Sequence, residues 1–457
     1  MARKPRQGLL PFDYVPDNGG EEITAWSGLP VLIELMKQLG IAAAIDKIGL
    51  RQRSTGFSAF ELVSSFALLL AAGGECCDDI VMLRNDKALT KLLGFELPSP
   101  SVLLRTLEQF HDEELVNVRP PQGAFIPPES DLLMELGGLY AVQTRAWANN
   151  SPDLKRATLD HDATVIESHK REALPHYKGG RGYQPVAVLW AETGLVVADQ
   201  FRDGNVPAGY SNIDTIERAL SNLPVTITER FFRADSACYE QKVLQFLVNN
   251  AVGFAISADM TRELRAVCGA VSESQWQRFE TRSDVDLDIA EVAFAPGDWH
   301  KSAAPLRYIT LRIRQTQGSL FADGSHTKYW AVVSNLDWKA DEILDWHRKK
   351  AGTIEQLHHT TKNELGAGVL PSGKFGANAA WYRLVLFTHN LLQLHKNFVA
   401  PPELRDAQPK RLRLRLFALP ARVFTHARWV FARVAAWALE LADVLAGRRR
   451  LLALAPS

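Results

Sequence analysis

The sequence predicts a mixed α+β protein: a mixed sheet with helices on both faces, preceded and followed by helical regions. Three observations predict this fold class. From Thr24 to about Phe110 the apolar residues recur at the spacing of helices. From about Lys155 the spacing changes to the alternation of strands, and beyond residue 338 helical spacing returns. The chain has 457 residues, enough for two or three domains.

Shifts in composition and periodicity divide the chain into five segments. We expect an all-helical, DNA-binding N-terminal region that ends in a Pro-rich linker, a core in two parts separated by a β-rich insertion, and a basic helical region at the C-terminal end. The predicted bounds are 1–130, 131–261, 262–337, 338–400 and 401–457.

The core is predicted from the order of its elements. Thr158–Ile166, Gln184–Ala191 and Leu195–Phe201 have the pattern of strands, and the tight turn between the last two indicates an antiparallel meander. A helix, a strand, a helix and a strand are then expected at Asn212–Leu223, Val225–Phe232, Tyr239–Asn249 and Gly253–Ser257. Three antiparallel strands followed by this alternation predict a mixed sheet of the ribonuclease-H type.

Carboxylates stand at two strand positions of this core. Asp160 and Asp162 share one face of the first strand, because side chains alternate along a strand. A buried carboxylate is costly unless it is paired or bound to a metal. Asp235 follows the strand Val225–Phe232, at the edge of an α/β sheet where ligands gather. The alternative is that these acids only cap turns.

A third carboxylate is predicted on a helix. Glu355, His359 and Lys362 share one helical face, just after the cations Arg348, Lys349 and Lys350. Glu355 and Lys362 are too far apart for a simple ion pair, so the lysine is free to meet a phosphate. Three carboxylates suit a pair of Mg²⁺ or Mn²⁺ ions that cleave a phosphodiester. No Cys/His set suits zinc, and His161 and His358 are expected on the surface or beside the ligands.

The distribution of charge and the targeting signals indicate which partners and which compartment to expect. The net charge is zero, but Pro402–Ser457 contains eleven Lys or Arg and four Asp or Glu, a balance of +7, which indicates a basic surface for nucleic acid. The Pro98–Ser101 turn before Arg105 is typical of a turn leading into a recognition helix. The four cysteines indicate reduced thiols, and no apolar run is long enough to span a membrane. We therefore expect a cytoplasmic, nucleoid-associated protein.

These motifs, in this order, resemble the DDE transposases of bacterial insertion sequences, in particular the group called insertion sequence thirteen-eighty, related to the insertion sequence four superfamily. The resemblance covers nearly the whole chain. It is carried by Leu159–Thr164, Lys178–Tyr183, Phe201–Asn205, Arg233–Ser236, Glu355 with Lys362, and Ala377–Ala380 leading to Asn390.

The resemblance implies that Asp162, Asp235 and Glu355 bind two metal ions, with Asp160 beside them or as an alternative ligand. It implies cut-and-paste transposition by a dimer on terminal inverted repeats and target DNA. It also implies DNA contacts, for which we take Arg105, Arg181, Arg233, Arg348, Lys349, Lys350 and Lys362. The family places an arginine at the position of Ala351, so which of residues 348–350 replaces it is open.

Two rival functions remain. A non-catalytic, transposase-derived DNA-binding protein needs no acids, and a ribonuclease-H-like nuclease or resolvase needs neither the large helical region nor the insertion. Trp276 and Trp299 are expected to pack in the insertion, with stacking on an extruded base as the alternative.

Overall fold

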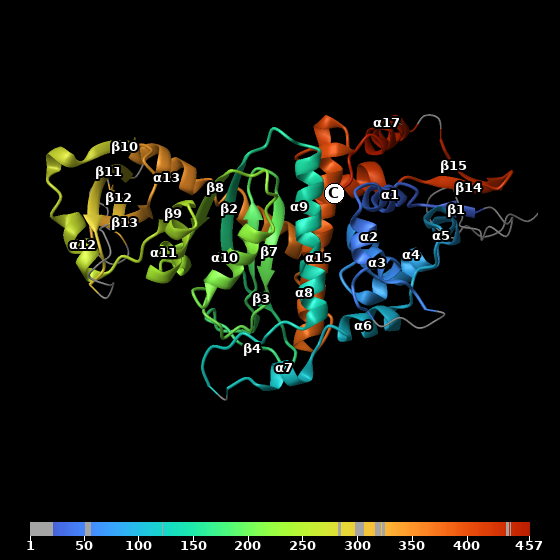
Figure 1. Ribbon diagram of the computed structural model, residues 1–457, viewed down its shortest axis with the longest axis horizontal. Helices are drawn as coiled ribbons and strands as arrows, with labels where there is room; N and C mark the ends of the chain where they lie inside the picture. Colours follow the sequence, from blue (N-terminus) through green and yellow to red (C-terminus); the bar gives the residue numbers. More distant parts are fainter. Residues whose placement is uncertain are drawn as a thin grey trace, which may run out of the picture.

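The computed structural model describes residues 22–50, 56–120, 122–281, 285–297, 306–315, 321, 325–435, 438 and 440–457. Its centre is a nine-stranded sheet that runs through the left and middle parts of the view in Figure 1. In spatial order the strands are β10 (Gln277–Thr281), β11 (Val285–Phe294), β12 (Leu306–Gln315), β13 (Thr327–Ser334), β9 (Gly253–Ser257), β8 (Glu229–Ala234), β2 (Arg156–Ala163), β6 (Val186–Trp190) and β7 (Leu195–Gln200).

The sheet is mixed, as predicted. β2, β6 and β7 form the antiparallel meander, while β8 pairs in parallel with β2 on one side and with β9 on the other. β8 begins four residues later than the sequence pattern predicts, because Val225 lies in a turn after Pro224 and is almost fully exposed. Pairing with β2 therefore sets the start of β8, with Glu229 opposite Arg156.

Helices cover both faces of this part of the sheet. Val188 and Trp190 of β6 pack into one core with α10 (Asn212–Ser221) and α11 (Gln241–Asn249). Ala187 and Leu189, which point the opposite way, pack into a second core that contains α15 (Phe375–Phe398) and α9 (Leu139–Asn149). β6 is buried on both faces, as its continuous apolar sequence Val-Ala-Val-Leu-Trp requires.

Helix α15 separates the sheet from the N-terminal helices (Figure 1). It is 24 residues long and buried over most of its length, packed against β7 and against α3 (Ala59–Ala72). No described helix, α15 included, is long and apolar enough to cross a membrane. The other helices of this part are α1 (Pro30–Gln38), α2 (Ile41–Ile45), α4 (Ile80–Arg84), α5 (Lys87–Leu93), α6 (Pro100–Glu108), α7 (Glu113–Asn117) and α8 (Asp131–Gly137).

The β-rich segment 262–337 continues the main sheet. β13 pairs antiparallel with β9, so β10 to β13 extend the core sheet without a break in hydrogen bonding. The segment also contains α12 (Arg262–Gly269), and the chain returns to the core through α13 (Ala340–Arg348) and α14 (Ile354–Glu364). The boundary predicted at residue 262 is therefore not a boundary of the sheet. A second small sheet follows β2, with β3 (Ile166–Glu167), β5 (Arg181–Tyr183) and β4 (Leu174–Pro175) in that order.

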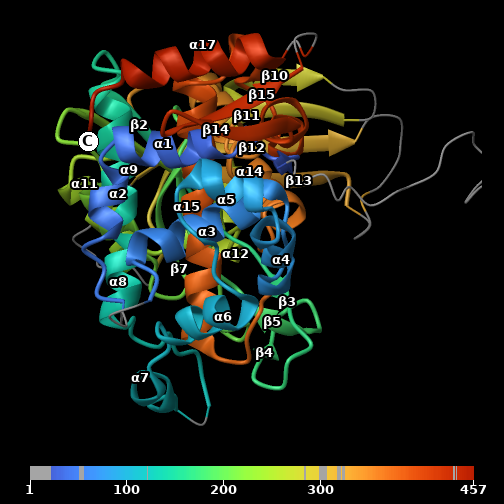
Figure 2. The same ribbon diagram turned by 90° about the vertical axis from the view of Figure 1, so that its right-hand side faces the viewer.

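The two ends of the described chain contain strands besides the helices predicted there, where an all-helical N-terminal region and a helical C-terminal region were expected. β1 (Glu22–Thr24), β14 (Ala421–His426) and β15 (Trp429–Val434) form a three-stranded antiparallel sheet on the N-terminal helices, as Figure 2 shows. Helices α16 (Pro409–Leu412) and α17 (Glu440–Leu452) flank the hairpin. Residues 421–434 carry β-branched and aromatic side chains around a short turn, which favours a hairpin over a helix.

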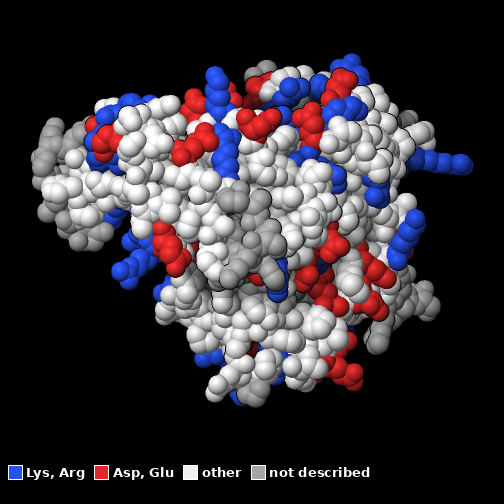
Figure 3. Space-filling model, turned by 60° about the vertical axis from the view of Figure 1, so that its left-hand side comes forward, with Lys and Arg blue, Asp and Glu red and all other residues white. Residues whose placement is uncertain are grey.

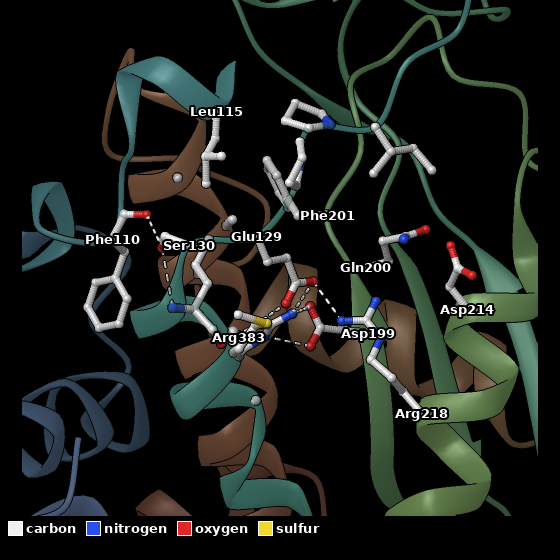
Figure 4. Close-up of a pocket in the computed structure, with 18 of the residues that line it drawn as sticks. Phe110, Leu115, Glu129, Ser130, Asp199, Gln200, Phe201, Asp214, Arg218 and Arg383 are labelled. Carbon is white, nitrogen blue, oxygen red and sulfur yellow. Dashed lines mark hydrogen bonds and ion pairs between the residues drawn. The ribbon is translucent and has the colours of Figure 1, made fainter. Parts of the chain in front are cut away.

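A buried ion network joins α15 to the sheet and to the linker that enters α8. The Arg383 guanidinium donates to Asp199 on β7 at 2.8 Å and to Glu129 at 3.0 Å. Tyr140 of α9 donates to the same Asp199 carboxylate at 3.0 Å. Figure 4 shows Glu129, Asp199 and Arg383 converging beside a cavity of about 570 Å³. Although burial acts against the charge of Glu129, Arg383 and Arg218 outweigh it and lower the Glu129 pKa to about 2.

Replacing Arg383 with methionine will destabilise the protein strongly. The change leaves Asp199 and Glu129 as buried charges without this partner, which typically costs about 3–5 kcal/mol. Thermal unfolding followed by circular dichroism will show a large fall in Tm for Arg383→Met. The control Arg405→Met, at an exposed position, will leave Tm within the error of wild type; equal changes in the two variants would contradict the role of the network.

Acid will weaken the same network. The Glu129 pKa is lowered from 4.5 to about 2, so its ion pairs stabilise the fold fully above pH 4.5, and this stability is lost as the pH falls toward 2. We expect the Tm of wild type to fall more steeply between pH 5 and pH 3 than that of Glu129→Gln, which has no proton to take up there. Parallel Tm curves for the two proteins would show that Glu129 is not coupled to folding.

Candidate active site

Two carboxylates meet at the ends of neighbouring parallel strands. His161 on β2 is paired in register with Ala234 on β8, so the next residues, Asp162 near the end of β2 and Asp235 just after β8, lie side by side at one edge of the sheet. This is the edge of an α/β sheet at which ligands and catalytic groups gather. Asp235 also caps the turn after β8 by accepting a hydrogen bond from the Ala237 amide at 3.1 Å. The capping interpretation and the site interpretation therefore hold for the same side chain.

A lysine and a histidine face Asp162. The Lys350 ammonium lies 3.3 Å from one carboxylate oxygen, and Nε2 of His358 lies 3.5 Å from the other. Burial alone would raise the pKa of Asp162, but His358 and Lys350 outweigh burial and hold this pKa below its ordinary value. Only 17% of the Asp162 side chain is exposed, so its contacts with Lys350 and His358 are largely buried.

Asp235 has the opposite shift. Although the residue as a whole is exposed, the protein atoms around its carboxyl partly exclude water and raise the pKa of Asp235. The positive charge of Lys350 lowers this pKa, and the negative charge of Asp162 raises it further. The two carboxylates therefore repel each other, and Lys350 offsets part of that repulsion. A pair of close carboxylates beside one cation is an arrangement that a divalent ion can also satisfy.

Asp160 does not reach this pair of carboxylates. It is fully buried and forms a double hydrogen bond with Arg233 of β8, at 2.6 and 2.8 Å. The hydroxyl of Thr353 donates to the same carboxylate. The Asp160 carboxylate is thus engaged by Arg233 and Thr353, and a role as an alternative metal ligand stays a prediction. Arg233 is 3% exposed and also donates to the Trp346 carbonyl, so its guanidinium has protein partners here, and its contact with DNA stays a prediction.

Glu355 stands in the first turn of α14, at an exposed position. The hydrogen bond from Thr353 to Asp160 holds the start of this helix against β2, two residues before Asp162. Within the described residues, no three His, Cys, Asp or Glu side chains gather closely enough to hold a metal ion. The structure therefore brings Asp162 and Asp235 together and sets Glu355 on the adjoining helix.

The predicted DNA-binding cations have different surroundings. Lys350 faces the carboxylates, whereas Arg348 is paired with Glu280 at 3.2 Å and lies over the Phe279 ring. Lys362 donates to the Val165 carbonyl at 2.7 Å, and burial lowers its pKa. Three of the cations are on exposed residues: Lys349, Arg181 and Arg105. On the face in Figure 3, blue and red side chains of the described residues are interspersed, and they do not form one basic surface.

Sequence reasoning missed the role of Thr353, and it left open whether His358 lies on the surface or beside the ligands. His358 is buried and faces Asp162, while its neighbour His359 is exposed. The available signal was the helical spacing from Glu355 to His358, which puts both on neighbouring positions of α14. Of the two tryptophans, Trp276 packs against Tyr329 under the Arg312 guanidinium, and Trp299 lies outside the described residues.

The donor set fits a hard divalent ion held by two carboxylates. Asp162 and Asp235 provide oxygen ligands, which hard divalent ions prefer. The Lys350 ammonium, 3.3 Å from Asp162, already places a positive charge beside this pair of carboxylates. The residues that would hold an ion are therefore Asp162 and Asp235, and Glu355, on the adjoining helix, is the third acid predicted to join them.

A family model described as the transposase DDE domain, group 1, matches residues 15–452. The chain belongs to this family and is a DDE transposase, and members of the family generally use divalent metal ions. No curated protein matches the chain.

Two solved structures show weak likeness. A piggyBac transposase synaptic complex with hairpin DNA has a TM-score of 0.45 at 11% identity, covering 85% of this chain and 80% of that one. The Mos1 strand transfer complex has a TM-score of 0.15 at 12% identity, covering 45% and 60%. The family assignment rests on the family model.

The two kinds of aspartate in this site will respond differently to substitution. Asp160→Asn removes a charge that pairs with buried Arg233 and will destabilise the fold by about 3–5 kcal/mol. Asp235→Asn removes a carboxylate whose ionised form is disfavoured in the fold, so Tm will stay the same or rise. Thermal unfolding at pH 7 compares the two variants. Equal losses of Tm would contradict the assignment of a structural role to Asp160 and of a role in the site to Asp235.

Proposed function

We propose that this protein is the transposase of an insertion sequence and moves it by a cut-and-paste route. Hydrolysis of one strand at each transposon end is followed by attack of the freed 3′-hydroxyl on target DNA. The observation that carries the proposal is the pair Asp162 and Asp235, side by side at the ends of parallel strands in a chain of the DDE family.

Asp162, Asp235 and Glu355 would hold two Mg²⁺ or Mn²⁺ ions. When bound, such ions lower the pKa of water and stabilise charge on the attacking and leaving oxygens of a phosphodiester. Glu355 is included because its helix is tied to β2 through Thr353 and Asp160, two residues before Asp162. Lys350 would keep the carboxylates close together and orient Asp162, and we assign it the work of the family arginine.

The partner is double-stranded DNA, at the terminal inverted repeats and at the target. Exposed Lys349, Arg181 and Arg105 would contact phosphates, a role that positions DNA without reading its sequence. Lys362 binds the Val165 carbonyl and would act by holding the segment after β2, next to Asp162. A homodimer would place one carboxylate site on each end of the element.

Asp235→Asn will slow metal-dependent cleavage strongly and leave DNA binding near wild type. Loss of one metal ligand removes several kcal/mol of transition-state stabilisation, a rate reduction of roughly a thousandfold. The measurement is nicking of labelled transposon-end DNA in Mg²⁺ or Mn²⁺, with binding followed by fluorescence anisotropy.

Asp153→Asn is the matched control, since Asp153 is an exposed aspartate that precedes β2 at its opposite end; it will cleave like wild type. Nicking by Asp235→Asn at the wild-type rate would refute the assignment of the carboxylates. A wild-type protein that binds the ends but cleaves in neither metal would instead be the non-catalytic DNA-binding relative.

A further inference from the structure

The sheet formed by β1, β14 and β15 has a buried face and an open face. Thr24 and Val423 are buried, and the sheet packs on α5 from this side. The hydroxyl of Thr24 donates to Asp86, the N-cap of α5. Side chains at the intervening positions, including Ile23 and Arg422, point the other way, because side chains alternate along a strand.

The open face is a ladder of aromatic and basic side chains. Its cross-strand pairs, taken toward the tip of the hairpin, are Arg422 with Arg433, Phe424 with Phe431, and His426 with Trp429. Trp429 is 73% exposed and Phe431 is 43% exposed. This face therefore leaves a substantial hydrophobic surface in water. Burying one large aromatic side chain is worth a few kcal/mol.

The arrangement of these side chains is ordered. The Phe424 and Phe431 rings are stacked, with centroids 5.3 Å apart and planes 17° from parallel. The Arg433 guanidinium lies 4.8 Å from the centroid of the Phe424 ring. At the tip, Ala427 and Arg428 both have positive φ, as in a tight two-residue hairpin turn, and this turn places exposed Arg428 next to Trp429.

The positive charge of the hairpin indicates which kind of partner its open face can bind. Residues 421–434 contain three arginines and no aspartate or glutamate. A second copy of this face would bring arginines against arginines, and like charges placed together are unfavourable. A nucleic acid has phosphates that match the guanidinium groups and flat bases that match the open rings. Aromatic rings alternating with cations are how proteins bind single-stranded nucleic acid.

We propose that the open face of β14 and β15 binds DNA, with an unpaired or splayed base stacked on Trp429 and phosphates held by Arg428 and Arg433. The inference rests on the proposed function in taking DNA as the nucleic acid. The hairpin sits on the N-terminal helices, and α15 lies between those helices and β2 (Figures 1 and 2). This contact would therefore hold DNA away from the carboxylates.

Trp429→Ala tests the stacking. The probe is fluorescein-labelled oligothymidine, and the measurement is fluorescence anisotropy at fixed salt. Stacking of a base on an aromatic ring is worth about 1–3 kcal/mol, so we expect Kd to rise at least about fivefold. Val225→Ala, at another exposed apolar position, is the control and will bind like wild type. Wild-type affinity in Trp429→Ala, with unchanged circular dichroism, would overturn the proposal.

Arg428→Ala tests the phosphate contact. Loss of one phosphate contact on a single strand reduces the slope of log Kd against log salt by about 0.7. Arg145→Ala, at an exposed arginine of α9, is the control and will keep the wild-type slope. If Trp429→Ala instead converts a dimer to a monomer in sedimentation and leaves the DNA affinity unchanged, the face belongs to a second copy and the proposal fails.

These outcomes separate the two proposals. If wild type cleaves transposon ends and Trp429→Ala binds oligothymidine like wild type, the hairpin inference fails and the proposed function stands. If Trp429→Ala loses affinity but wild type cleaves in neither metal, the binding face stands and the proposed chemistry fails.

Discussion

The buried pair of Asp160 and Arg233 is the interaction on which the geometry of the site depends. It links β2 to β8, and through Thr353 and the Trp346 carbonyl it also fixes the start of α14 and the end of α13. β2, β8 and the α13–α14 segment, which are far apart in sequence, are thus joined through this one buried ion pair. A buried charge without its partner is strongly destabilising, so alternative registers of these strands are excluded. Asp162 and Asp235 are held next to each other as a result.

The sequence predicted the order of the core elements well, because the hydrophobic period changes clearly between helices and strands. Strand periodicity could not separate the roles of Asp160 and Asp162, and only the family resemblance favoured Asp162 as the ligand. Alternation places both on one face, but burial ends only at the last residues of β2, and depth along a strand is not visible in its period. The burial of Arg233 was not predicted, because its partner lies 73 residues away and nothing near it in sequence distinguishes a buried guanidinium from an exposed one.

The same limit explains the other differences. Helical spacing placed Glu355 and Lys362 on one face of a helix. In the structure, however, Lys350, before that helix, is the lysine that faces the carboxylates. The C-terminal cations suggested a helical face, although the apolar residues between them alternate as in strands. Continuity of β13 with β9 is a long-range pairing that local pattern does not contain. For Lys350 and for β13 the missing information is a contact between segments far apart in the chain, whereas the hairpin of β14 and β15 had a local signal that the count of cations obscured.

The pairing of β1 with β14 has a consequence for the order of folding. Ser27 donates to the Leu419 carbonyl across 392 residues of sequence, and the Ser457 amide donates to Leu39. The α1 and α2 helices are therefore synthesised long before β14, on which the completion of the adjoining sheet and its hydrogen bonds depends. Contacts of such high sequence separation form slowly. We therefore expect the sheet of β1, β14 and β15 to form late in folding, and a nascent chain that lacks β14 to leave β1 without its partner strand, open to association with other chains.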